Sequence, residues 1–89
     1  MPYDSIKRED AAVIIARALQ KCGVELSGRR EFKDDDKISP YAAESVGVLA
    51  AKGILLGSDG YFSPESKITR GETAVMLYRA FNAWMEETK

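Results

Sequence analysis

Histidine is absent from this chain of 89 residues, and cysteine occurs once, as Cys22. Without histidine the common Ser-His and Cys-His nucleophile pairs cannot form, and neither can a zinc site of Cys and His ligands within one chain. A single cysteine also excludes an internal disulfide, so the apolar core must hold the fold. Because Cys22 ends an apolar helical stripe, we expect it to pack as a small hydrophobic side chain.

The sequence also lacks a long apolar run and an excess of either charge. No stretch approaches the roughly 20 apolar residues of a membrane-spanning helix, and the first residues lack the features of a signal peptide. Lys and Arg number 13 and Asp and Glu number 14, whereas a duplex-binding domain normally carries a clear positive excess. We therefore expect no membrane insertion and no nucleic-acid partner, and an exported protein would contain this sequence as an excerpt.

What the chain does contain is an internal repeat. Residues 6–19 recur 62 positions later as residues 68–81, and six of the fourteen paired positions are identical. Such repeats are typical of arrays in which one unit covers the apolar face of the next. The repeat therefore favours a binding surface built between units over a private active site.

Three segments have the spacing of amphipathic helices, with apolar residues every three or four positions. They span about residues 5–22, 40–52 and 69–87, and turn-rich segments connect them. The sequence thus predicts an all-α fold, a small three-helix bundle with long connecting loops. The side chains expected to face the core are Ala11, Ala12, Ile15, Ala18, Leu19 and Cys22, then Tyr41, Ala42, Val46, Leu49 and Ala50, then Ala74, Leu77, Phe81 and Trp84.

Residues at the helix ends support these boundaries. We expect Asp4 or Ser5 to cap the first helix and Gly23 to end it in the left-handed conformation. The Ser-Pro pair at 39–40 suits a helix start, because proline is tolerated where its missing N–H is not needed. Residues 69–72 form a capping box, in which the Thr hydroxyl and the Glu carboxylate bond two otherwise unpaired N–H groups.

Five short motifs in order resemble one S-layer homology (SLH) motif. They are Phe32-x-Asp34, Ile38-Ser39-Pro40-Tyr41-Ala42, Gly53-Ile54-Leu55-x-Gly57, Asp59-Gly60-x-Phe62-x-Pro64 and Ile68-Thr69-Arg70-Gly71-Glu72. The Asp-Gly pair in the fourth motif also predicts a tight turn. Residues 6–19 resemble the closing half of a preceding motif. We therefore divide the chain into residues 1–31, a closing half motif and linker, and residues 32–89, a complete motif.

SLH modules usually occur in threes, and each motif supplies a helix to a central bundle and a prong that projects from it. The resemblance implies a non-catalytic module, without cofactor or metal, that anchors a secreted protein at the bacterial cell wall or S-layer. It implies a secondary cell-wall polysaccharide attached to peptidoglycan as the partner, often with an acidic pyruvate ketal. The ligand is expected in grooves between prongs, and further SLH motifs of the parent chain are expected to complete them.

The resemblance also implies that Arg70, in the Thr-Arg-x-Glu box, contacts the ligand. A guanidinium fits a carboxylate through two hydrogen bonds, and the start of a helix favours an anion. Alternatively, Arg70 is an exposed residue of the first helical turn, or it pairs with Glu65 or Glu72 and supports the fold. Arg8 is the matching residue of the half motif, but Lys7 there replaces the capping threonine, a loss of about 1 kcal/mol.

Glu9 and Asp10 also depart from the family pattern, and Glu9 is expected to add negative charge where an anion would bind. Tyr41 falls where the family usually has Trp, and it can stack on a sugar ring or belong to the core. Gly57 would let a sugar approach the backbone, or simply serve turn geometry. The predicted ligand-binding set is Arg70, Arg8, Asp34, Tyr41 and Gly57.

Other functions are weighed against this one. Half a motif leaves an apolar helix face without its partner, so the chain can self-associate, by swapping or trimerisation, into a three-prong bundle.

A helix-turn-helix DNA binder is disfavoured by the near-neutral charge. Residues 34–36 lack the Gly and Glu that a calcium-binding EF-hand loop needs at later positions. Glu65 and Glu72 could form a glycosidase pair, but a helical chain this short has little room for a substrate cleft, so we expect no enzyme.

Overall fold

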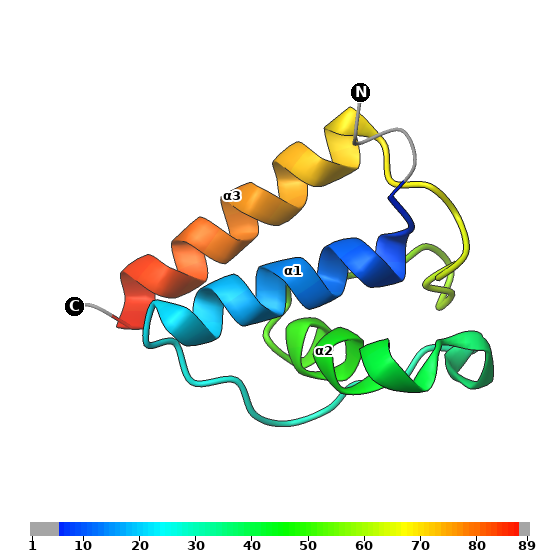
Figure 1. Cartoon of the computed structure of the whole chain (residues 1–89), viewed down its shortest axis with the longest axis horizontal. Helices are drawn as coiled ribbons and strands as arrows, with labels where there is room; N and C mark the ends of the chain where they lie inside the picture. The colour runs from blue at the N-terminus through cyan, green and yellow to red at the C-terminus, as the bar shows by residue number, and fades with distance from the viewer. Residues whose placement is uncertain (1–5, 88–89) are drawn as a thin grey trace.

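The computed structural model describes residues 6–87. It contains the helices α1 (Arg8–Lys21), α2 (Pro40–Ala51) and α3 (Arg70–Glu87), and one short 3-10 helix, η2 (Asp35–Lys37). In Figure 1, α1 lies between the other two helices, and it packs more extensively on α2 than on α3. The only strand-like pairings within the described residues are two isolated β-bridges. The predicted all-α fold is confirmed.

The core lies mainly between α1, α2 and the loops that follow them. Its largest fully buried apolar side chains are Leu49, Ile54 and Val46. The loops also contribute to the core, because apolar residues from each connection are buried beside the helices. The buried loop residues are Val24, Phe32, Ile38, Ile54, Leu55, Phe62 and Ile68.

Helices α1 and α2 end in the same way. Gly23 has a φ of +88°, as predicted, and the N–H of Val24 donates to the carbonyl of Leu19 (3.0 Å). The equivalent bond after α2 runs from Ile54 to Leu49 (2.9 Å). Both ends are Schellman motifs, which bond the last carbonyls and bring an apolar residue back onto the helix. Each motif therefore attaches the following loop to the core.

The start of α1 differs from the prediction. The helix begins at Arg8, and its N-cap is Lys7, whose side chain makes no capping bond. Asp4 and Ser5, the predicted caps, lie outside the described residues. The chain before Arg8 is extended because Lys7 forms an antiparallel bridge with Lys67. The starts of α1 and α3 are thereby joined.

The predicted orientation of α3 is wrong for most of its residues. Leu77 and Phe81 are each 55% exposed and Ala74 is exposed, whereas Met76 and Ala80 are buried. The helix carries two apolar stripes, and only the one through Met76 and Ala80 lies against the rest of the chain. Trp84 is partly buried against the core, as expected.

Three other predicted core residues are exposed. Cys22 is exposed because α1 ends before it, and Val24 takes the buried position through the Schellman motif. Ala18 lies on the outer side of α1. Tyr41 is 62% exposed although the next residue, Ala42, is completely buried, so Tyr41 lies on the outer side of the first turn of α2. The remaining predicted core positions of α1 and α2 are buried or partly buried.

Candidate functional site

The loop between α2 and α3 turns sharply at residues 58–61. Ser58 and Tyr61 exchange two backbone hydrogen bonds, of 2.8 and 2.9 Å. Between them Asp59 and Gly60 have φ values of 53° and 87°. Positive φ at both central residues defines a type I′ turn, for which Asp-Gly is well suited. The tight turn predicted at this pair is confirmed.

Gly57 precedes this turn and has a φ of 71°. A Cβ atom there would lie 2.7 Å from Cε1 of Phe32 and 2.6 Å from the carbonyl oxygen of Tyr61. The ring of Phe32 is itself held against Phe62, with their centroids 5.4 Å apart. Gly57 is therefore required by the local packing, whatever else it contacts.

Asp34 fixes the other end of the loop. Its Oδ1 accepts a hydrogen bond from the N–H of Phe62 (2.9 Å), and its Oδ2 accepts one from the N–H of Ser63 (2.8 Å). Burial alone would raise the pKa of Asp34, but these backbone bonds favour the carboxylate and leave the pKa below its usual value. Since both oxygens are occupied and the residue is 8% exposed, its geometry suits it to position the loop.

A cavity of about 540 Å³ lies between this loop and the first turns of α3. One part of its lining is apolar and comes from Ile54, Leu55, Leu56, Phe62, Val75 and Met76. The polar part comes from Arg8, Ser58, Ser63, Thr69, Glu72 and Arg79. Such a mixture of apolar walls and a few polar groups is typical of small-ligand sites.

Glu72 organises the start of α3 at the edge of this cavity. Its Oε1 accepts a hydrogen bond from the N–H of Thr69 (3.0 Å), and the Thr69 hydroxyl accepts one from the N–H of Glu72 (3.1 Å). The predicted capping box is therefore confirmed. The other carboxylate oxygen forms an ion pair with the guanidinium of Arg8. Glu72 thus holds Arg8 against the cavity.

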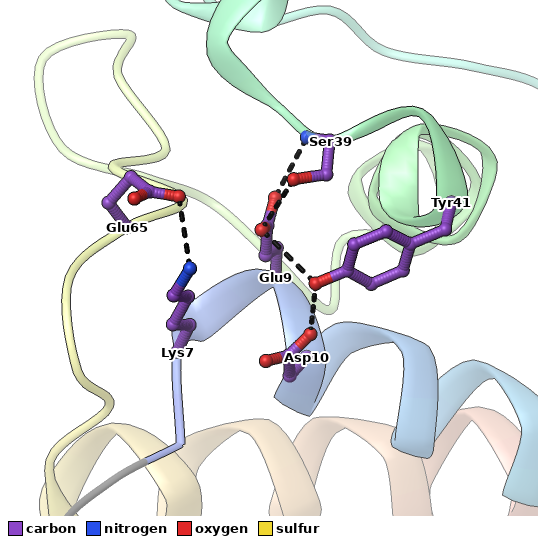
Figure 2. Close-up of polar contacts among 6 residues, drawn as sticks. All are labelled: Lys7, Glu9, Asp10, Ser39, Tyr41 and Glu65. Atoms are coloured by element: carbon purple, nitrogen blue, oxygen red, sulfur yellow. Dashed lines mark hydrogen bonds and ion pairs between the residues drawn. The ribbon is translucent and has the colours of Figure 1, made fainter.

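Arg70 lies outside the lining of this cavity. It is the exposed first residue of α3. Its exposure agrees with the alternative of an exposed first-turn residue. Among the described residues, Lys7 pairs with Glu65 at 3.4 Å and Arg8 pairs with Glu72, and Arg70 forms an ion pair with neither carboxylate. Figure 2 shows the contact between Lys7 and Glu65.

Glu9, in the first turn of α1, is completely buried beside the start of α2. Its carboxylate accepts hydrogen bonds from the N–H (2.9 Å) and the hydroxyl (2.8 Å) of Ser39, as Figure 2 shows. Ser39 is the N-cap of α2, but its own side chain makes no capping bond. Glu9 therefore stabilises the start of α2 and does not line the cavity, so the charge that we expected at an anion site is directed at Ser39.

The hydroxyl of Tyr41 lies between the carboxylates of Glu9 and Asp10 (Figure 2). Its hydrogen bond to Asp10, together with desolvation and the nearby negative charges, raises the pKa of Tyr41 to about 12. The ring does not line the large cavity. It borders a smaller hollow of about 190 Å³ with Arg17 and Glu44.

The structure brings together only part of the predicted set. Arg8 and Gly57 line the large cavity, and Asp34 bonds two residues of its wall. Arg70 and Tyr41 lie elsewhere. Arg79 also lines the cavity and was not among the predicted residues, although its spacing from Glu72 on a helix could have indicated that the two share a face.

No group of three or more Cys, Asp or Glu side chains in the described residues is arranged to hold a metal ion. Among residues 6–87, no helix has the length and apolar character needed to cross a membrane.

Residues 31–74 match the family model of the S-layer homology domain. Through this segment the chain belongs to the S-layer homology family, whose domains are non-catalytic anchoring modules. The family thus assigns the chain a role as a cell-surface anchoring module.

Several larger proteins contain a similar sequence. An amylopullulanase of Thermoanaerobacterium thermosulfurigenes is 37% identical over 81 residues, which cover 86% of this chain and 4% of that protein. The exoglucanase XynX of Acetivibrio thermocellus is also 37% identical, over 86% of this chain and 8% of that protein. The outer membrane protein SlpA of Thermus thermophilus is 44% identical over 50 residues, 55% of this chain and 6% of its own length. The chain therefore spans only a small part of these relatives, and no solved structure matches it.

Proposed function

We propose that this chain anchors a larger exported protein to the bacterial cell wall by binding an anionic secondary cell-wall polysaccharide. The polysaccharide is attached to peptidoglycan and carries pyruvate ketals. The observation that carries the proposal is the cavity of about 540 Å³, which lies largely within the family segment and combines apolar walls with arginine side chains. An acidic sugar offers both an apolar ring face and a carboxylate to such a lining.

In this proposal the predicted residues have different roles. Arg8, paired with Glu72, forms part of the wall that the ligand contacts, and the backbone at Gly57 lies close to the sugar. Asp34 positions the loop through its bonds to two backbone N–H groups. Tyr41 offers an exposed ring for stacking at the smaller hollow.

Arg70 belongs to a second groove in this account. Arg8 and Arg70 occupy equivalent positions of the internal repeat, since residues 6–19 match residues 68–81. Arg8 lies beside the loop of residues 54–63. By the same relation, Arg70 contacts ligand beside the corresponding loop of a further SLH motif.

Co-sedimentation with peptidoglycan sacculi tests the proposal. Sacculi that retain their secondary polymer are compared with sacculi stripped of it, using the wild-type chain, Arg8→Gln and Arg70→Ala. We expect retention that depends on the polymer and weakens in Arg8→Gln; loss in Arg70→Ala would indicate that the second groove also contributes. Equal retention on both kinds of sacculi would refute polymer binding.

Self-association is a second candidate, favoured by the exposed apolar stripe of α3. Four positions of α1 that are buried in the core have repeat equivalents in α3 that are exposed. The buried positions are Ala12, Ile15, Ala16 and Leu19, and the exposed equivalents are Ala74, Leu77, Tyr78 and Phe81. Further copies of the chain would cover this stripe and build a three-prong bundle. Sedimentation equilibrium should then give a mass that rises with concentration and falls in Leu77→Asp, whereas a monomer at all concentrations would exclude this role.

A further inference from the structure

One side of α3 faces the cavity throughout its first half. Glu72, Val75, Met76 and Arg79 all line the cavity, and their spacing of three and four residues places them on one face of a helix. Arg70 precedes Glu72 by two residues, so it lies about 200° around the helix axis. Helix geometry therefore explains why Arg79 reaches this cavity and Arg70 does not.

The charges in the cavity do not balance. Its lining contains two cations, Arg8 and Arg79, and one anion, Glu72. The Glu72 carboxylate is occupied by Arg8 and by the N–H of Thr69. Within the described part of the chain, the structure gives the half-buried Arg79 no ion-pair partner. The excess of one positive charge in the cavity is therefore that of Arg79.

We propose that Arg79 binds the acidic group of the ligand directly, while the Arg8–Glu72 pair positions the neighbouring wall. This inference rests on the function proposed above and names the residue that recognises the charge. A guanidinium offers paired donors to a carboxylate. A single uncompensated cation beside Val75 and Met76 suits a singly charged carboxylate on an apolar carbon better than a phosphate group.

The repeat supplies a matched control. Arg17 occupies the position in α1 that is equivalent to Arg79 in α3, but it is exposed and borders only the smaller hollow. Removing either arginine takes one positive charge from the same side of a repeat helix. Only the substitution of Arg79 removes a positive charge from the large cavity.

The test measures dissociation constants for sacculi that retain their polymer, using Arg79→Gln, Arg79→Lys and Arg17→Gln. We expect binding about tenfold or more weaker for Arg79→Gln, a smaller loss for Arg79→Lys because the charge remains, and at most a small loss for Arg17→Gln, because Arg17 borders only the smaller hollow beside Tyr41. Thermal melting checks that all variants are folded. If the wild type binds and Arg79→Gln binds equally well, the inference is wrong although the proposed function stands.

A second measurement separates the two proposals if the wild type is not retained. Pyruvate is titrated into the chain while the guanidinium Nε–H signals are followed by NMR. A shift of the Arg79 signal, without a shift of Arg17, supports the assignment of Arg79 as an anion-binding residue even without polymer binding. Unchanged Arg79 signals at saturating pyruvate would overturn it.

Discussion

Asp34 determines the shape of one wall of the cavity. Its two oxygens accept hydrogen bonds from successive N–H groups 28 and 29 residues away, those of Phe62 and Ser63. Ser63 has a φ of 61°, a conformation that is uncommon for a residue with a side chain and needs support from its surroundings. The sequence predicted Asp34 as a site residue through a family motif, but no local pattern could reveal these distant partners.

Replacing Asp34 by asparagine should destabilise the chain. In the wild type each carboxylate oxygen accepts a bond from one backbone N–H, whereas the NH2 group of asparagine would face one of these N–H groups with a donor. The free energy of unfolding should therefore fall by about 1–3 kcal/mol. Urea unfolding measures the change. Asp36→Asn is the control, because Asp36 is exposed in the neighbouring 3-10 helix, and an equal effect of both substitutions would contradict the role of Asp34.

The lowered pKa of Asp34 also predicts a dependence on acid. The unfolded chain takes up a proton near the ordinary value of 3.8, whereas the folded chain does so only at a lower pH. The stability from Asp34 is therefore fully present above about pH 4 and is lost as the pH falls through the folded pKa. Unfolding measured from pH 6 to pH 2 should show a shallower decline for Asp34→Asn than for the wild type, and parallel curves would argue against the shift.

Gly57 and Gly53 differ in what surrounds them, although both have positive φ. An alanine at Gly53 would meet no atom within 4 Å, so only the backbone conformation opposes it, at about 1–2 kcal/mol. An alanine at Gly57 would also clash with Phe32 and Tyr61, adding about 1–3 kcal/mol. We therefore expect Gly57→Ala to lower the thermal midpoint clearly more than Gly53→Ala, and equal midpoints would contradict this packing.

At the scale of the helices, the start of α1 also caps α2. The half motif has lost the capping box that α3 retains, and Glu9 instead accepts two hydrogen bonds from Ser39 at the start of α2. A carboxylate beside a helix start is favourable because the unpaired N–H groups there carry partial positive charge. The departure of residues 7–10 from the family pattern therefore joins two helices.

The pKa of Tyr41 should report the contact between α1 and α2 in alkaline solution, because its hydroxyl bonds Glu9 and Asp10. Its pKa is about 12 in the folded chain and about 10 in the unfolded one. The folded chain keeps the proton longer, so the stabilising contribution is complete below pH 10 and is lost as the pH rises through 12. Ultraviolet titration of the wild type minus Tyr41→Phe should place this phenol near 12. An ordinary value near 10 would contradict the contacts with Asp10 and Glu9.

The existence of the helices and most of their ends could be predicted because their causes are local, whereas the start of α1 depends on the distant bridge between Lys7 and Lys67. Apolar spacing, Gly23, the Ser-Pro pair and the capping box each act within a few residues. The buried side of α3 could not be predicted, since the helix carries apolar residues on two sides and the choice depends on how it meets α1. For the same reason the spacing alone did not reveal that Arg79, and not Arg70, lines the cavity.

At the scale of the whole molecule, the two repeat helices start side by side. The bridge between Lys7 and Lys67 and the ion pair between Arg8 and Glu72 join their first turns. The cavity forms where this junction meets the loop of residues 54–63. The repeat favoured a binding surface between units, and the cavity lies where the two repeat helices start, but the sequence could not show which arginine of each unit would face it.

The central claim is that this cavity binds an acidic glycan, and NMR of the labelled chain with purified cell-wall polysaccharide tests it most directly. We predict amide shifts in residues 54–63 and 69–79 with the native polymer, and their loss once its acidic groups have been removed chemically. Shifts that survive removal of the acidic groups, or that fall only outside these segments, would contradict the account.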